Sequence, residues 1–215
     1  CSCGMEMFGK DNKVWIRETD YEQVKITMLF YSPILHASSV WRRSSFERHN
    51  LYYRQGTFPA EDYDLWARAI FHCKLVNIPQ VLYKYRIHGE QVTKTDSRSS
   101  LREHRIRTEY LRRALPSLSD DDVYAIIQSI EKKKSSLRDM NNAFRRMLYS
   151  NRQTNFFNHK YLKHRLKKVL FTSVDGLSAK KNCFFLLREI GCKQTFLYRM
   201  RTIKRKIISS NNFLS

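Results

Sequence analysis

The chain has 215 residues, of which 42% are hydrophobic and 28% charged, and its formal net charge is +20. This length and composition are typical of one folded domain, with or without an appended helical segment, and exclude a long disordered linker. No apolar run approaches the about 20 residues that span a bilayer, and no charged-then-apolar signal sequence opens the chain, so we do not expect an integral membrane protein.

The positive charge is concentrated toward the C-terminus. Residues 151–215 hold 15 Lys and Arg residues against Asp175 and Glu189, a local net charge of +13. Such an excess predicts an anionic partner surface for this third of the chain. The chain also starts at Cys1, without an initiator Met and within sequence that has the pattern of a folded domain, so we expect it to be a piece of a longer protein.

The cysteines are odd in number and unevenly spaced. They form neither a disulfide framework nor a pair of metal-spaced couplets, which indicates a reducing compartment. The five residues are Cys1, Cys3, Cys73, Cys183 and Cys192.

The first 60 residues alternate between strand and helix signals. A strand or hairpin is predicted within residues 1–19. Asp20, with Gln23 three residues on, predicts the start of a helix that Pro33 ends. The next predicted elements are a strand over residues 36–41 (HASSVW), a helix over 43–48 that Asn50 closes, and a loop over 53–59.

A further helix is predicted from Glu61, because apolar residues from Leu65 to Cys73 recur at helical spacing. Its first turn holds three carboxylates, and the positive end of the helix dipole favours each of them by about 0.3–1 kcal/mol. These are Glu61, Asp62 and Asp64. Two short strands are predicted next, over residues 75–78 and 81–87, with Pro79 between them.

Beyond about residue 95 every predicted element is a helix. We therefore place a domain boundary there, between a mixed α/β part (residues 1–95) and a basic, all-helical extension (residues 96–215). Helical periodicity covers residues 97–115, and Ser119 with the three Asp residues after it predicts the start of a long helix that reaches Leu148. The remaining predicted helices are 156–172, 179–190 and 194–209.

Three segments of the first 95 residues occur together in a known order: HASSVWRRSSF, then EDYDLWARA, then NIPQVLYKYRIHGEQVT. This part of the chain resembles the second half of the catalytic domain of family-2 glycosyltransferases, enzymes of the GT-A fold. Bacterial members typically show a Glu-Asp-Tyr-Asp-Leu-Trp block, an Asn-Ile-Pro-like turn and a Tyr-Arg-x-His close. The resemblance implies an α/β fold, the second half of a Rossmann-like GT-A domain, followed by the all-α basic extension.

The resemblance assigns the first roles to the acidic block. Asp62 would be the general base that takes the proton from an acceptor hydroxyl, a function that typically contributes about 10²–10⁴ in rate. Glu61 would orient or contact the acceptor. Trp66 would bind or orient the acceptor, with a place in the core as the alternative. The helix dipole favours the same carboxylates for purely structural reasons, so their position alone does not decide between the two interpretations.

The close of the motif supplies two more candidates. His88 corresponds to a histidine that helps to hold the metal or the diphosphate in many GT-A enzymes. Arg86 would pair with Asp62 or Asp64, or face phosphate. His36, Arg42 and Arg43 would lie near the acceptor side, with a solvated charged face as the alternative for the two arginines.

One expected part of the catalytic machinery is not found in the sequence. Enzymes of this family bind the nucleotide on a preceding half-domain and hold a divalent metal, Mg or Mn, through an Asp-x-Asp motif. Asp62-Tyr63-Asp64 matches those letters but lies in the later helix. We therefore expect the metal to be held mainly by residues outside this chain, and the chain alone to be inactive.

The resemblance implies transfer of a sugar, with inversion, from a nucleotide-sugar donor to a glycan or lipid-linked acceptor of a bacterial surface polymer. The expected location is cytoplasmic, and peripheral on the inner membrane face. Tyr161, Leu162, Leu166 and residues 169–171, interleaved with basic residues, would serve an anionic membrane surface, with a solvated, weakly packed extension as the alternative. The alternative is a basic, helical nucleic-acid-binding protein, which would explain the charge but not the acidic block.

Overall fold

The computed structural model describes residues 1–9, 12–87, 98–131 and 136–173. The chain divides into two compact units, Cys1–Arg165 and Leu166–Ser215. The fold below is that of the first unit, since only residues 166–173 of the second are described. The predicted boundary near residue 95 lies in the segment 88–97, outside the described residues, and stays a prediction. The helices predicted at 179–190 and 194–209 also lie outside them.

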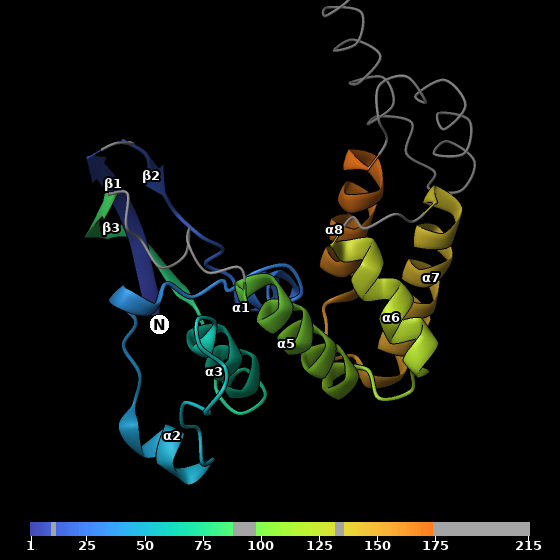
Figure 1. The fold of residues 1–215 in the computed structure, drawn as a ribbon, viewed down its shortest axis with the longest axis horizontal. Coiled ribbons are helices and arrows are strands. Elements are labelled where there is room, and N and C mark those ends of the chain that lie inside the picture. The colour runs from blue at the N-terminus through green and yellow to red at the C-terminus, as the bar shows by residue number, and fades with distance from the viewer. Residues whose placement is uncertain (10–11, 88–97, 132–135, 174–215) are drawn as a thin grey trace, which may run out of the picture. The chain divides into compact units, whose positions relative to one another are not determined.

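The strands of the described residues form one sheet in the order β2-β1-β3 (Figure 1). Strand β1 (Ser2–Gly9) pairs antiparallel with β2 (Val14–Trp15), which confirms the predicted hairpin within residues 1–19. It pairs in parallel with β3 (Asn77–Ile87) on its other side. A parallel pair needs a crossover connection, and here the helices between β2 and β3 supply it. The mixed α/β character predicted for this part of the chain is confirmed.

The prediction that Pro79 divides two strands is wrong, because β3 runs through the proline without ending. Ile78 pairs with Cys3 and Val81 with Gly4, so Pro79 and the residue after it lie in an irregularity of the register. A proline has no N–H to donate to the ladder, and a bulge is a position where that loss is tolerated.

The helix predicted after Asp20 is α1 (Tyr21–Thr27), and its cap is confirmed, because the Asp20 side chain accepts a hydrogen bond from the Gln23 N–H at 3.1 Å. Its predicted end at Pro33 is wrong, because the helix ends at Thr27. The predicted strand over residues 36–41 is wrong. His36–Ser38 forms a short 3-10 helix, η1, in which the Ser39 hydroxyl donates to the His36 carbonyl at 2.7 Å. Serine hydroxyls that bond nearby backbone groups in this way compete with strand pairing. The predicted helix α2 (Arg43–Arg48) is confirmed.

Helix α3 (Glu61–Ala69) begins at the predicted residue. Two hydrogen bonds connect α3 and the residue after it to α1 and the residue after α1. The Tyr63 hydroxyl donates to the Met28 carbonyl, and the Tyr21 hydroxyl donates to the Ile70 carbonyl at 3.0 Å. The core around it consists of apolar side chains from α1, α3 and the first helix of the C-terminal half. Fully or nearly fully buried members are Val24, Met28, Leu29, Leu65, Trp66, Ile70, Leu111 and Leu115.

The described residues of the C-terminal half form helices, as predicted: α5 (Arg98–Ala114), α6 (Asp120–Ile130), α7 (Leu137–Thr154) and α8 (His159–Thr172). The long helix predicted from residue 119 to 148 is wrong in its length. Ser119 caps α6 as expected, but Ser136 starts a second helix by accepting a hydrogen bond from the Asp139 N–H at 3.1 Å. This Ser-x-x-Asp pattern is itself a helix-start signal.

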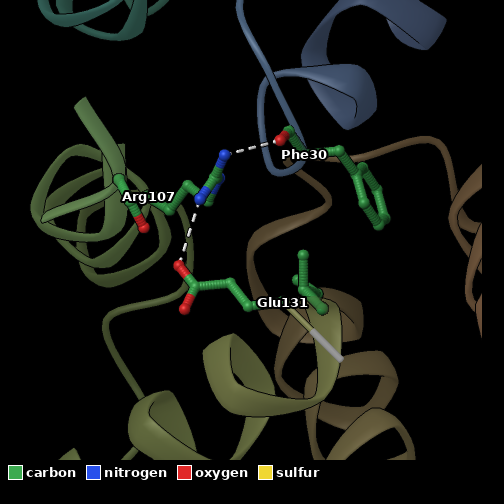
Figure 2. Close-up of a pocket in the computed structure, with 5 residues that line it drawn as sticks. Phe30, Arg107 and Glu131 are labelled. Atoms are coloured by element: carbon green, nitrogen blue, oxygen red, sulfur yellow. Dashed lines mark hydrogen bonds and ion pairs between the residues drawn. The ribbon is translucent and has the colours of Figure 1, made fainter. Parts of the chain in front are cut away.

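The C-terminal helices are joined to α1 by polar contacts. The Tyr110 hydroxyl donates to the Lys25 carbonyl at 2.8 Å, and the Lys25 ammonium group donates to the Phe156 carbonyl at 2.5 Å. Arg107 donates to the Phe30 carbonyl at 2.8 Å and to Glu131 at 3.0 Å (Figure 2).

A pocket of about 270 Å³ lies at this junction. Its lining contains none of the predicted site residues: Phe30, Ser100, Arg107, Ile130 and Glu131. Arg107 in this lining donates hydrogen bonds to the Glu131 carboxylate and to the Phe30 carbonyl. These two bonds connect α5 to the end of α6 and to the segment that follows α1.

Two observations bear on the membrane. No helix in the described part of the chain is both long and apolar enough to cross a bilayer. In the predicted membrane-facing set, Tyr161 is 39% exposed, whereas Leu162, Leu166, Val169 and Leu170 are buried. The side chain of Phe171 lies outside what the structure describes, and a peripheral membrane contact stays a prediction.

Candidate active site around Asp62

The three carboxylates at the start of α3 have different environments. Asp64 is almost completely buried and accepts two hydrogen bonds from Arg68, at 2.8 and 3.0 Å. The guanidinium group of Arg54 lies 3.6 Å from its other oxygen. Asp64 is therefore a structural carboxylate that joins α3 to the preceding loop.

No cation of the described residues pairs with Asp62 in this way. Its Oδ1 accepts a hydrogen bond from the Tyr63 N–H at 2.7 Å, at the open end of the helix. Burial raises the pKa of Asp62 above its ordinary value, and the negative charge of Glu61 adds to this effect. The Tyr63 N–H and the nearby His36 act in the opposite direction but do not cancel it. Since a raised pKa makes a carboxylate a stronger base, the environment of Asp62 suits proton abstraction.

Glu61 has an unused hydrogen-bond acceptor. Its Oε2 is buried and has no hydrogen-bond partner among the described residues. A buried polar atom without a partner costs free energy, and such atoms deserve an explanation, of which a ligand group is one. An acceptor hydroxyl could supply the missing donor here.

Two residues far apart in the sequence complete the surroundings of Asp62. The His36 Nε2 lies 2.8 Å from the Tyr53 hydroxyl, and their rings lie 5.8 Å apart. Burial raises the pKa of Tyr53, and the negative charges of Asp62 and Glu61 raise it further, so its hydroxyl is within electrostatic range of both carboxylates. His36 was predicted for the acceptor side, but Tyr53 was not. A tyrosine in a loop has no periodicity that marks it as a site residue.

Arg17 was also missed by the sequence argument. Its guanidinium group donates to the Ser32 carbonyl at 2.6 Å and lies over the Trp15 ring at 4.2 Å. Burial lowers the pKa of Arg17, while the charges of Tyr31, Glu18 and Asp62 act against this lowering. A partly buried positive charge therefore lies within electrostatic range of the candidate base.

Trp66 is only 1% exposed, so protein covers both faces of its ring. The exposed ring beside it is that of Trp41, which packs edge-on against Trp66 with their centroids 5.5 Å apart. Trp66 also lies edge-on to His36, at 6.3 Å. That Trp66 orients the acceptor stays a prediction. Because its ring is buried, Trp66 would do so by packing against His36 and Trp41.

The other predicted site residues stay predictions, and the structure describes the surroundings of Arg86 and Arg43. Arg86 lies on β3 with its guanidinium group over the Phe8 ring at 5.4 Å, whereas the cations against Asp64 are Arg54 and Arg68. Arg43 is exposed and pairs with Glu47 at 2.7 Å, as expected of a solvated face. His88 lies outside the described residues.

The metal site implied by the resemblance was expected mainly outside this chain. Among residues 1–9, 12–87, 98–131 and 136–173, no three His, Cys, Asp or Glu side chains gather in a way that could hold a metal ion. The described residues therefore do not fit a resident metal by themselves. The predicted divalent ion stays a prediction about a longer protein.

Comparison with known proteins gives one partial relative. An uncharacterized glycosyltransferase of Haemophilus influenzae is 31% identical over 84 residues, which cover 39% of this chain and 26% of the relative. The chain therefore matches about a quarter of that relative's length. No protein-family model matches the chain, and no solved structure matches it.

Proposed function

We propose that this chain forms the acceptor-binding, base-bearing part of an inverting glycosyltransferase of family 2 and the GT-A fold. The observation that carries the proposal is Asp62, a carboxylate at the start of α3 whose pKa is raised by burial. The neighbouring Glu61, with its unpartnered oxygen, supports it. The partial similarity to a protein named as a glycosyltransferase supports the same class.

In the proposed reaction, an acceptor hydroxyl attacks the anomeric carbon of a nucleotide-sugar donor. The new bond forms between the hydroxyl oxygen and that carbon, the bond from the carbon to the donor phosphate breaks, and the nucleoside diphosphate leaves. The hydroxyl proton passes to Asp62. Because Oδ1 is bonded to the Tyr63 N–H, Oδ2 is the oxygen that receives the proton. A single displacement of this kind inverts the anomeric configuration.

The remaining side chains have proposed parts on the acceptor side. Glu61 accepts a hydrogen bond from a second acceptor hydroxyl, and the Tyr53 hydroxyl, set by His36, lies within electrostatic range of both carboxylates. Trp41 offers an exposed ring on which a sugar face can stack. We further propose a cytoplasmic enzyme, peripheral on the inner membrane face, that acts on a glycan or lipid-linked acceptor.

The proposal is tested with a longer protein in which this chain follows its nucleotide-binding half. The protein is incubated with a panel of nucleotide sugars, and the release of nucleoside diphosphate and the glycosylated product are measured together. We expect a product whose anomeric configuration is opposite to that of the donor. Failure of every donor in the presence of Mg or Mn and total cell glycolipid would count against the proposal.

The first variant concerns Glu61. Glu61→Gln keeps the size of the side chain but removes its charge, so a charge-assisted hydrogen bond to the acceptor becomes a neutral one. We expect the KM for the acceptor to rise about tenfold, a difference of about 1.4 kcal/mol, with little change in the KM for the donor. Steady-state kinetics with each substrate varied in turn measures both values.

Glu47→Gln is the matched control, because Glu47 is a partly exposed carboxylate on α2 that pairs with Arg43. It should leave both KM values at those of the parent. An unchanged acceptor KM in Glu61→Gln would remove Glu61 from the acceptor site.

A further inference from the structure

A group of basic side chains lies around the C-terminal end of α3, apart from the start of the helix that carries Asp62. Its members come from the end of α2, the loop before α3, the end of α3 and the last turn of α5. Figure 1 shows α3 beside α5, and the two helices are in contact. We call these residues the cationic cluster: His49, Arg54, Arg68, His72 and Arg113.

The two histidines of the cluster are stacked, with their ring centroids 4.4 Å apart and their planes at 23°. Arg113 Nη2 lies 2.8 Å from His72 Nε2. Because a guanidinium group can only donate, this nitrogen of His72 accepts, and the imidazole is neutral with its proton on Nδ1. Burial and then the charges of Arg113 and His49 lower the pKa of His72, which agrees with a neutral ring.

The carboxylates of this region are shared among several cations. Asp64 lies 2.8 Å from Arg68 and 3.6 Å from Arg54. Glu109 lies 3.4 Å from Arg54 and 2.8 Å from Arg105. Two carboxylates therefore serve three guanidinium groups, and one of the two is buried.

Arg113 adds a fourth guanidinium group. No carboxylate of the described residues lies in ion-pair range of it. Its charge lies over the Phe71 ring at 4.1 Å and against the neutral His72. Partial desolvation lowers the pKa of the exposed Arg113, and the positive charges of Arg54 and Arg68 lower it further, so the cluster holds like charges within electrostatic range of one another. A bound anion would relieve this repulsion.

We propose that the cationic cluster binds the phosphate group of a phosphorylated acceptor, an inference that rests on the proposed function. Guanidinium groups match phosphate oxygens with paired N–H donors, and an imidazole N–H can add another. Phosphate would be held by Arg113 and the histidines, which are exposed, while Arg54 and Arg68 add attraction from the side of Asp64.

The position of the cluster fits an acceptor that reaches Asp62. Arg68 lies six residues beyond Asp62 on α3, which is about 9 Å of helix rise. The loop before α3 takes part in both regions, since the charge of Asp62 acts on Tyr53 and Arg54 lies 3.6 Å from Asp64. We propose that an acceptor with its hydroxyl at Asp62 and its phosphate at the cluster is a phosphorylated glycan that spans at least this length.

The test uses the 215-residue chain and inorganic phosphate, with the imidazole signals of its 7 His residues followed by nuclear magnetic resonance. His49→Asn and His72→Asn assign the two signals of the stacked pair. We expect these two signals to shift and to saturate with half-saturation near or below about 1 mM phosphate, while chloride at equal ionic strength leaves them in place. Arg113→Gln should weaken this binding by about tenfold or more.

The matched control is Arg43→Gln, because Arg43 is an exposed arginine on α2 that pairs with Glu47 and is not a member of the cluster. It should bind phosphate as the parent does. The proposal is overturned by any of three results: no saturation up to about 10 mM phosphate, an equal loss of binding in both arginine variants, or binding to phosphatidylglycerol vesicles that phosphate does not compete away. The last result would assign the cluster to a membrane surface.

A second measurement separates this inference from the proposed function. In the transfer assay with the longer protein, Arg113→Gln should raise the KM for a phosphorylated acceptor but not for the same acceptor without its phosphate. Transfer without any phosphate binding would overturn the inference and leave the proposed function standing. Saturable phosphate binding without transfer of any sugar would overturn the proposed function and leave the phosphate site standing.

Discussion

Replacing Asp62 by Asn is expected to lower the rate of sugar transfer by about 10²–10⁴-fold, the usual contribution of a general base. Asn keeps an oxygen that can accept from the Tyr63 N–H, so the start of α3 should hold its shape. It cannot take the proton from the acceptor hydroxyl. Binding of the nucleotide sugar should persist, because the base acts on the acceptor and not on the donor. Initial rates and donor calorimetry on the longer protein measure the two effects.

Asp120→Asn is the control for this change, because it removes a carboxylate with 86% of its side chain exposed, on α6. It should transfer sugar at the rate of the parent. Near-normal turnover in Asp62→Asn would refute the role of this carboxylate as the base. A joint loss of transfer and donor binding would indicate a change in structure instead.

Asp64→Asn is expected to lower the free energy of unfolding by about 3 kcal/mol, the size of effect found when one partner of a buried ion pair is removed. The side chain of Asp64 is 5% exposed and that of Arg68 13%, so the change leaves a guanidinium charge with little access to water. Arg54 loses part of its compensation as well. Urea unfolding of the 215-residue chain at neutral pH measures the loss.

The same Asp120→Asn variant should stay within about 0.5 kcal/mol of the parent, since exposed ion pairs contribute little. Adding Arg68→Met to Asp64→Asn should restore part of the lost stability, because the uncompensated charge is then removed. If Asp64→Asn unfolds like the parent, Asp64 does not hold α3 in place, and its burial in the structure has no energetic consequence.

Local signals were sufficient to predict most helices. The Asp20 cap and the start of α3 at Glu61 lie where sequence patterns placed them, because each depends on residues within one or two turns. The strand over residues 36–41 failed for the same local reason, since its serines bond to nearby carbonyls. The predicted break at Pro79 was wrong because a strand tolerates a proline where its pairing with the partner strand is irregular. The sequence around Pro79 does not contain that pairing.

The site could be predicted only where it is contiguous. Glu61, Asp62 and Asp64 form one run in the sequence, but nothing local distinguishes the buried ion-paired Asp64 from Asp62. Their different roles depend on Arg54 and Arg68, which neutralise one carboxylate and not the other. Similarly, the contact between His36 and Tyr53 spans 17 residues.

The cationic cluster depends on still longer-range contacts. His72 and Arg113 are 41 residues apart, and the stacking of His49 on His72 joins the end of α2 to the end of α3. Periodicity and capping rules describe neighbours along the chain, so they do not predict which loops meet. Tertiary packing also decides which tryptophan near the site is exposed: Trp41 is exposed, and Trp66, against which it packs, is buried.

The most direct test of Asp62 as the base is the pH dependence of kcat/KM for the acceptor. The base is active as the carboxylate, so kcat/KM should fall as the pH falls through its pKa. Burial raises that pKa above the ordinary 3.8, which moves the acidic limb to higher pH. We predict that Asp62→Asn loses this limb and shows a flat, low profile over the same range. An acidic limb of the same midpoint in Asp62→Asn would contradict the account, because another group would then be the base.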